Sequence, residues 1–326
     1  MLPNHFGNYI LYFAVVLGYK IPMDINITNP IFHDEAKAAA HIEATRWNGE
    51  PVCPHCGSVE VTRLKGKTQA GYFQCNGCRD KFTVRTGTVM ERSHVPLHKW
   101  LLATHIMAAS KKGMSAAQMG RMIGVTYKTA WFLCHRIREA MDGANDGNGP
   151  LGGPGQIVEA DETFVGGKAK NRAWGAIPKK KVVVSLVERG GKSKSFHVAN
   201  IHANTLRGVL VQNIDRGSTL MTDDNRSYTT VGREFKGGHF AVNHTLAQYA
   251  QGLYHSNTVE NFFSIFKRGV IGTYHHLSEA HMHRYLAEFD LRANTRDMSD
   301  AERAGEIIRG AIGRRLTYRR TGQSAA

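Results

Sequence analysis

The chain has 326 residues, more than one domain usually contains, so two or three modules are expected. Its 42 lysine and arginine residues outnumber 27 acidic residues, and the formal net charge of +15 favours a polyanionic partner, foremost nucleic acid. Five cysteines are an odd number, which argues against a secreted disulfide framework and indicates a reducing cytosol. The apolar run within residues 1–22 is about half the length that spans a bilayer, so no membrane segment is expected.

Changes in composition divide the chain into segments. Residues 1–22 are interpreted as an extension from an early start codon, with a short buried strand or helix as the alternative. A multidomain α+β chain is expected from the remaining segments: an amphipathic helix (23–48), a cysteine-rich segment (49–92), three helices (93–142), a glycine-rich flexible linker (143–156), a mixed α/β segment (157–296) and a basic C-terminal tail that includes a helix (297–326). Strands in the mixed segment are predicted at 157–163, 181–188, 194–199 and 218–222.

Four of the cysteines form two C-x2-C pairs separated by 18 residues, the spacing of a four-thiolate zinc site: Cys53, Cys56, Cys75 and Cys78. The surrounding segment has too few large apolar residues for a core of its own. Bound Zn2+ is therefore expected to stabilise a zinc ribbon, with four buried or redox-active cysteines as the alternative. Because protein ligands fill all four positions, such a site is structural rather than catalytic.

A helix-turn-helix is predicted after the ribbon. Ser115 caps a short helix, Gly124 occupies a turn, and a second helix runs from about residue 126 to 141. A plain helical bundle is the alternative. Four residues at the start of the second helix are expected to contact bases in a major groove: Thr126, Tyr127, Lys128 and Thr129.

Acidic residues occur in three separated segments of the mixed region. Asp161 is expected at the end of the strand in IVEADETFVGGK, with Glu162 pointing to the opposite face because side chains alternate along a strand. Asp223 ends the strand in STLMTDDNRSY. Glu260 lies on a helix in HSNTVENFFSIFKRG, on the face that also carries Asn257. Turn or cap residues are the alternative for each acid taken singly.

Two carboxylates on neighbouring strands and one on a helix have the geometry to hold a pair of Mg2+ or Mn2+ ions. Cleavage of a phosphodiester needs such ions, because the charge that develops lies on the phosphoryl oxygens. The three acidic segments together therefore predict a metal-dependent phosphodiester site.

In this order, the motifs CPHCG, CNGC, VEADETFVGGK, MTDDNRSY and HSNTVENFFSIFKRG resemble the zinc-ribbon DDE transposases of bacterial insertion sequences, over about residues 23–296. The resemblance implies an RNase-H-like mixed α/β catalytic domain with Asp161 and Asp223 as its first two metal-binding residues. Glu260 matches the third acidic position, and Asn257 is the alternative third member. Lys267 matches a basic residue that holds DNA near the cut.

The function that this resemblance implies is transposition of an insertion sequence. The front end is expected to bind double-stranded DNA at the terminal inverted repeats, and the metal site to cut it and join the freed 3′-hydroxyl to target DNA. Pairing of two ends implies a homo-oligomer, acting in the bacterial cytoplasm at the nucleoid. Lys168 in the FVGGK turn is expected to approach DNA, with an ordinary hairpin turn as the alternative. The rival functions are a non-catalytic DNA-binding regulator and an RNase-H-like nuclease that does not transpose.

Overall fold

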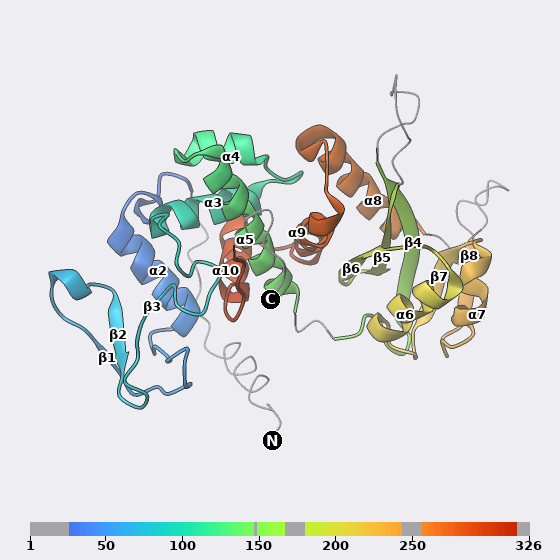
Figure 1. Ribbon diagram of the computed structural model, residues 1–326. Helices are drawn as coiled ribbons and strands as arrows, with labels where there is room; N and C mark the ends of the chain where they lie inside the picture. Colours follow the sequence, from blue (N-terminus) through green and yellow to red (C-terminus); the bar gives the residue numbers. More distant parts are fainter. Residues whose placement is uncertain (1–25, 147–148, 167–179, 243–255, 318–326) are drawn as a thin grey trace, which may run out of the picture.

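The computed structural model describes residues 26–146, 149–166, 180–242 and 256–317 (Figure 1). The extension expected at residues 1–22 and the residue Lys168 lie outside this part of the chain. Within it, no helix is both long enough and apolar enough to cross a membrane.

The cysteine-rich segment folds as a small antiparallel sheet of three strands: β1 (Val61–Arg63), β2 (Tyr72–Cys75) and β3 (Lys81–Thr83). Phe73 and Phe82 stack with ring centroids 5.4 Å apart, and Trp47 meets both rings edge-on. Trp47 is the last residue of helix α2 (Glu35–Trp47). The side chain of Trp47 therefore completes the apolar core of the ribbon, because the ribbon itself has few large apolar residues.

Three helices follow the ribbon: α3 (Leu97–Ala109), α4 (Ala116–Ile123) and α5 (Tyr127–Asn145). Ser115 caps α4, and Gly124 ends it in the left-handed conformation at φ 65°, so that three residues connect α4 to α5. Helical spacing in the sequence predicts a core-facing stripe on α5, and its members are all buried: Ala130, Leu133, Cys134, Ile137 and Met141.

The glycine-rich segment that we expected to be a flexible linker begins inside α5, which continues to Asn145. Gly143 lies against Gly310, the last residue of helix α10 (Asp300–Gly310): a Cβ on Gly143 would lie 2.1 Å from the carbonyl oxygen of Gly310. Gly143 therefore allows close contact between two helices, a role that composition does not distinguish from flexibility. Helix α10 packs into the core of the N-terminal helices through Ile307 and Ile308.

The second half of the chain is built on a mixed five-stranded sheet in the order β6-β5-β4-β7-β8 (Figure 1). The central strand β4 is antiparallel to β5 and parallel to β7, as in the RNase-H-like arrangement that we expected. The strands are β4 (Ile157–Val165), β5 (Lys181–Glu188), β6 (Ser193–Val198), β7 (Thr219–Asp223) and β8 (His239–Val242).

Helices cover both faces of this sheet. On one face, α6 (Ala203–Asn213) and α7 (Thr229–Gly232) bury the apolar side chains of β4, β5 and β7. On the other face lie α8 (Asn257–Gly269) and α9 (Met282–Asn294), which a π-helical turn at Val270–Tyr274 separates. Both helices agree with the two that the sequence predicts between residues 257 and 296.

Helix α9 connects the two halves, because it packs on β6 and also on α5. Its fully buried Glu288 accepts hydrogen bonds from Arg138 of α5 (2.6 Å), Arg292 (2.5 Å) and the Tyr274 hydroxyl (2.7 Å). Burial alone would raise the pKa of Glu288, but Arg138 and Arg292 lower that pKa to about 2. The carboxylate therefore remains charged and holds α9 against α5.

Candidate metal centres

The four thiol groups of the ribbon converge on one point. The Cys53 and Cys78 sulfurs lie 3.7 Å apart, and the Cys56 and Cys75 sulfurs 3.5 Å apart. A tetrahedral ion with Zn–S bonds of about 2.3 Å requires sulfurs roughly 3.8 Å apart, so the cluster fits Zn2+. The amide of Cys78 donates to the Cys75 sulfur and lowers the pKa of that thiol to about 6, which favours the thiolate that binds metal.

We expect Cys75→Ser to abolish the zinc content of the purified protein, whereas Cys134→Ala should leave it at about one equivalent per chain. Cys134 is buried in α5 and belongs to the helical core, so it serves as the matched control. Atomic emission measures the metal, and near-ultraviolet circular dichroism reports the aromatic contacts of Trp47. Retention of zinc by Cys75→Ser would contradict the four-thiolate assignment.

The second cluster consists of three carboxylates on the mixed sheet. One oxygen from each of Asp161, Glu162 and Asp223 lies within 4.8 Å of the others. In an octahedral Mg2+ site with bonds of about 2.1 Å, ligand oxygens are roughly 3 to 4 Å apart, so this donor set fits a hard divalent cation. The predicted approach of Asp161 to Asp223 is therefore confirmed, since β4 and β7 are adjacent and parallel.

Two details of β4 correct our expectations. Asp161 lies in the middle of β4 rather than at its end, because pairing with β5 continues to Val165. Pairing with β7, in contrast, stops at Glu159. Beyond that point none of the described strands pairs with this edge of β4, so the long side chain of Glu162 reaches the other two acids although it starts from the opposite face.

Two residues after β7 fix the position of Glu162. The Asn225 side-chain amide donates to one carboxylate oxygen (2.8 Å) and the Tyr228 hydroxyl to the other (2.6 Å). The backbone amide of Asn225 also donates to Asp223 (3.2 Å). Burial and the charge of Glu162 raise the pKa of Tyr228 well above its ordinary value, so the hydroxyl remains a donor. We did not predict these roles, because they depend on a contact between segments 63 or more residues apart.

The Asp161 carboxyl is hard to ionise without a cation. Burial raises its pKa to about 7, and the charges of Asp223, Glu162 and Glu260 add to this effect, although the Glu162 amide opposes it by donating to Asp161. A divalent ion between the carboxylates would reverse this repulsion. The cluster therefore favours cation binding at neutral pH.

This pKa predicts a pH-dependent stability. Because the pKa of Asp161 is higher in the folded chain than in the unfolded chain, protonation stabilises the fold, and stability falls as pH rises from about 4 to 7. Without added divalent metal, urea unfolding should show a loss of up to about 1.4 kcal/mol per pH unit, relative to Asp161→Asn. Asp290, whose pKa burial also raises to about 7, is present in both proteins and cancels. Parallel pH profiles would contradict the assignment.

Helix α8 brings the predicted third acid to the same face of the sheet. Glu159 of β4 is fully buried and accepts hydrogen bonds from the Thr258 and Val259 amides at 2.8 and 3.0 Å, which caps the first turn of α8. Arg189 forms an ion pair with Glu159 at 2.6 Å. Alternation along a strand predicts Glu159 on the same face as Asp161, but the capping role of Glu159 becomes visible only in the fold.

The remaining predicted residues of α8 are exposed: Asn257, Glu260 and Lys267. Glu260 is close enough to Asp161 to raise its pKa, yet its carboxylate is outside the group of oxygens within 4.8 Å and accepts a hydrogen bond from Ser256 (3.2 Å). Helical spacing in the sequence also predicts that Phe262, Phe263 and Phe266 face the core, and all three are buried.

At the start of α5, Thr126 accepts the amide of Thr129 and thereby caps the helix. Tyr127 is 60% exposed. Thr126 and Lys128 are also exposed, and Thr129 is half-buried. The residues that we expected to contact bases thus lie at an accessible helix end.

Comparison with known proteins identifies the class. Residues 150–294 match the model of the ISXO2-like transposase domain, and residues 33–81 match that of the transposase zinc-ribbon domain. The first match contains the carboxylate cluster, and the second contains all four ribbon cysteines together with the beginning of β3. The chain is therefore similar to transposases in both of these segments. Within that class, the resemblance to zinc-ribbon transposases of insertion sequences is confirmed.

Individual relatives are more distant. A Halobacterium salinarum protein described as an uncharacterized protein in transposable element ISH50 is 28% identical over 279 residues, or 80% of this chain and 91% of that protein. The Caenorhabditis elegans male abnormal protein mab-31 is 26% identical over 189 residues, 52% of this chain and 44% of that protein. Among solved structures, the Mos1 strand transfer complex is 11% identical with a TM-score of 0.26, over 64% of this chain and 74% of that one. The pre-cleavage Mos1 transpososome is 8% identical with a TM-score of 0.19, over 63% of this chain and 76% of that one.

Proposed function

We propose that this transposase cuts DNA at the ends of an insertion sequence and joins the freed 3′-hydroxyl to target DNA, in a reaction that depends on Mg2+ or Mn2+. The observation that carries the proposal is the convergence of Asp161, Glu162 and Asp223 within 4.8 Å, inside the segment that matches a transposase domain. Bound metal would supply activation of the attacking oxygen and stabilisation of the leaving oxygen. The chain itself supplies the ligands and holds them in place through Asn225 and Tyr228.

For the third acidic member we propose Glu260, with Asn257 as its rival. Both residues lie in the first turn of α8, which Glu159 fixes to the strand that carries Asp161. Glu260 has the stronger claim, because its charge already acts on the pKa of Asp161. Lys267 lies two helical turns further along α8, where we propose that it contacts a DNA phosphate.

The front end is proposed to bind the terminal inverted repeats. Tyr127 and Lys128 are exposed at the start of α5, where a helix enters a major groove in proteins with this layout. Two ends must be held together during transposition, so we also propose a homo-oligomer. The excess of basic residues suits both duplex contacts and target DNA.

The test uses linear DNA that carries the native element ends, incubated with the protein and either Mg2+ or a chelator selective for Mg2+ over Zn2+. We expect nicks that leave a 3′-hydroxyl at the element end, followed by joined products when a supercoiled plasmid is added. Binding without any cleavage in Mg2+ would instead indicate a regulator. Cleavage without joined products would indicate a nuclease that does not transpose.

A further inference from the structure

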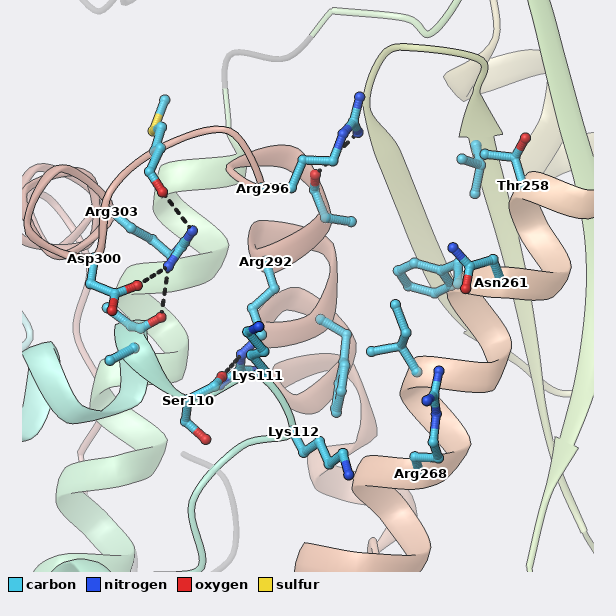
Figure 2. A pocket seen from close by; sticks show the side chains of 18 of the residues that line it. Ser110, Lys111, Lys112, Thr258, Asn261, Arg268, Arg292, Arg296, Asp300 and Arg303 are labelled. Carbon is cyan, nitrogen blue, oxygen red and sulfur yellow. Dashed lines mark hydrogen bonds and ion pairs between the residues drawn. The ribbon is translucent and has the colours of Figure 1, made fainter.

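A cavity of about 680 Å³ lies on the side of α8 that faces α9 (Figure 2). Its walls come from four places far apart in the sequence: the end of α3 with the loop that follows it, the end of β5 with the turn after it, the length of α8, and α9 with the residues that follow it. This volume is within the range of small-ligand sites and would hold one or two nucleotide units. No residue that lines the cavity belongs to the cysteine cluster or to the carboxylate cluster.

The rim of the cavity has uncompensated positive charge. Lys111 and Lys112 on the loop and Arg268 on α8 are exposed, and no carboxylate in the described ranges forms an ion pair with them. Figure 2 shows Lys112 and Arg268 at the same end of the cavity, on facing elements. Of the two acidic residues in the lining, Asp300 is paired with Arg303 at 2.7 Å, which leaves Glu188 against three cations. An anion is the favoured occupant of this rim.

The floor of the cavity is apolar. Phe262 and Phe289 are buried beneath it, whereas Ile265 and Met298 are 38% and 40% exposed and line it directly. A free inorganic anion gains nothing from such a floor. An anion that carries a flat apolar group gains contact between that group and the apolar floor. A nucleotide is such an anion, because it combines a phosphate with a flat base.

The walls are held in position by contacts that exist without a ligand. Arg292 donates to the carbonyl oxygens of Ser110 (2.5 Å) and Met107 (3.0 Å), which fixes the loop to α9. Gly269 lies so close to the loop that a Cβ there would be 2.9 Å from the Lys112 carbonyl oxygen. The cavity is therefore preformed, and binding to it requires little ordering of the protein.

The cavity begins next to the proposed cutting site. Thr258 and Asn261 line it, while Glu260, between them in sequence, is on the side of α8 that acts on Asp161. A strand that leaves the carboxylate cluster across the first turns of α8 would reach the cavity directly. Base pairs in a duplex keep their faces stacked, so only an unpaired strand presents a base to Ile265.

We propose that this cavity binds an unpaired segment of the DNA strand next to the cut, with a base against Ile265 and Phe262 and phosphates at Lys111, Lys112 and Arg268. This inference rests on the proposed function, since it takes DNA as the substrate. It adds a second DNA contact that is separate from both the metal centre and the start of α5.

The test measures binding of a fluorescent twelve-residue oligothymidylate by anisotropy over a range of salt concentrations. Lys112→Ala with Arg268→Ala should weaken binding at least tenfold and reduce the salt slope by roughly 1.4, because about 0.7 of a counterion is released per single-strand phosphate contact. Lys236→Ala is the matched control, since Lys236 is an exposed lysine of the same half outside the cavity. An unchanged slope in the double variant would overturn the proposal.

A second variant tests the floor. Ile265→Ser should weaken oligothymidylate binding about tenfold without changing the salt slope, since a stacking contact is lost and no charge is removed. If Ile265→Ser instead alters the oligomeric state in light scattering and leaves binding intact, the cavity is a protein contact and the proposal fails. Asp161→Asn separates the two proposals: it should stop cleavage and keep oligothymidylate binding. Unchanged oligothymidylate binding by the cavity variants, together with normal cleavage by the unaltered chain, would overturn this inference alone.

Discussion

Asp161→Asn is expected to lower the rate of Mg2+-dependent cleavage of element-end DNA by roughly 10³-fold or more. Asparagine keeps the shape of the side chain and can still accept the Glu162 amide, but it removes a negative ligand from the centre of the cluster. Metal-based stabilisation of the transition state is worth several kcal/mol, and about 4 kcal/mol corresponds to that loss of rate. Single-turnover cleavage of labelled DNA measures the effect.

Asp297→Asn provides the control for this substitution. It makes the same chemical change at a carboxylate that is 89% exposed and outside the cluster, so its cleavage rate should match that of the unaltered chain. The unaltered chain, Asp161→Asn and Asp297→Asn should bind end DNA equally, because the residues proposed to contact DNA bases are on α5. Cleavage by Asp161→Asn at a rate near that of Asp297→Asn would exclude Asp161 from the reaction.

Glu288→Gln is expected to destabilise the protein by roughly 3 to 5 kcal/mol, the usual cost of removing one partner from a buried ion pair. The variant would leave Arg138 buried beside Arg292 without a balancing carboxylate. Because this network joins α5 to α9, its loss weakens the contact between the N-terminal helices and the half that contains the mixed sheet. Urea unfolding at pH 7 measures the difference in free energy.

Glu279→Gln is the matched control for that measurement. Glu279 is 73% exposed and lies 3.9 Å from His197, so its substitution should change stability by less than about 0.5 kcal/mol. Equal unfolding midpoints for Glu288→Gln and Glu279→Gln would show that the buried network does not hold the two halves together.

Patterns with a short period were sufficient to predict much of this molecule. The two cysteine pairs predicted a ribbon cluster, helical spacing predicted the buried stripe of α5, and apolar runs predicted β4 and β7 with their acids. The cysteine pairs and the helical stripe depend on residues only a few positions apart in the sequence. The acids of β4 and β7 follow from the position of a single residue within each apolar strand.

Features that depend on the ends of neighbouring strands and on helix contacts were not accessible in this way. Alternation along β4 predicted that Glu162 points away from the cluster. Its side chain reaches the cluster because the pairing of β4 with β7 stops at Glu159, three residues earlier. Gly143 suggested flexibility, whereas its function is to admit Gly310. The caps and donors supplied by Glu159, Asn225 and Tyr228 join segments whose approach no local pattern specifies.

The central claim is that the carboxylates of the mixed sheet bind a divalent cation, and Mn2+ binding followed by electron paramagnetic resonance tests it most directly. The zinc-loaded chain should bind Mn2+ at pH 7.5, and Asp161→Asn combined with Asp223→Asn should abolish that binding while the zinc content stays unchanged. Glu162→Gln should weaken it, because Glu162 completes the oxygen cluster. Equal Mn2+ binding by the unaltered chain and the double variant would contradict the claim.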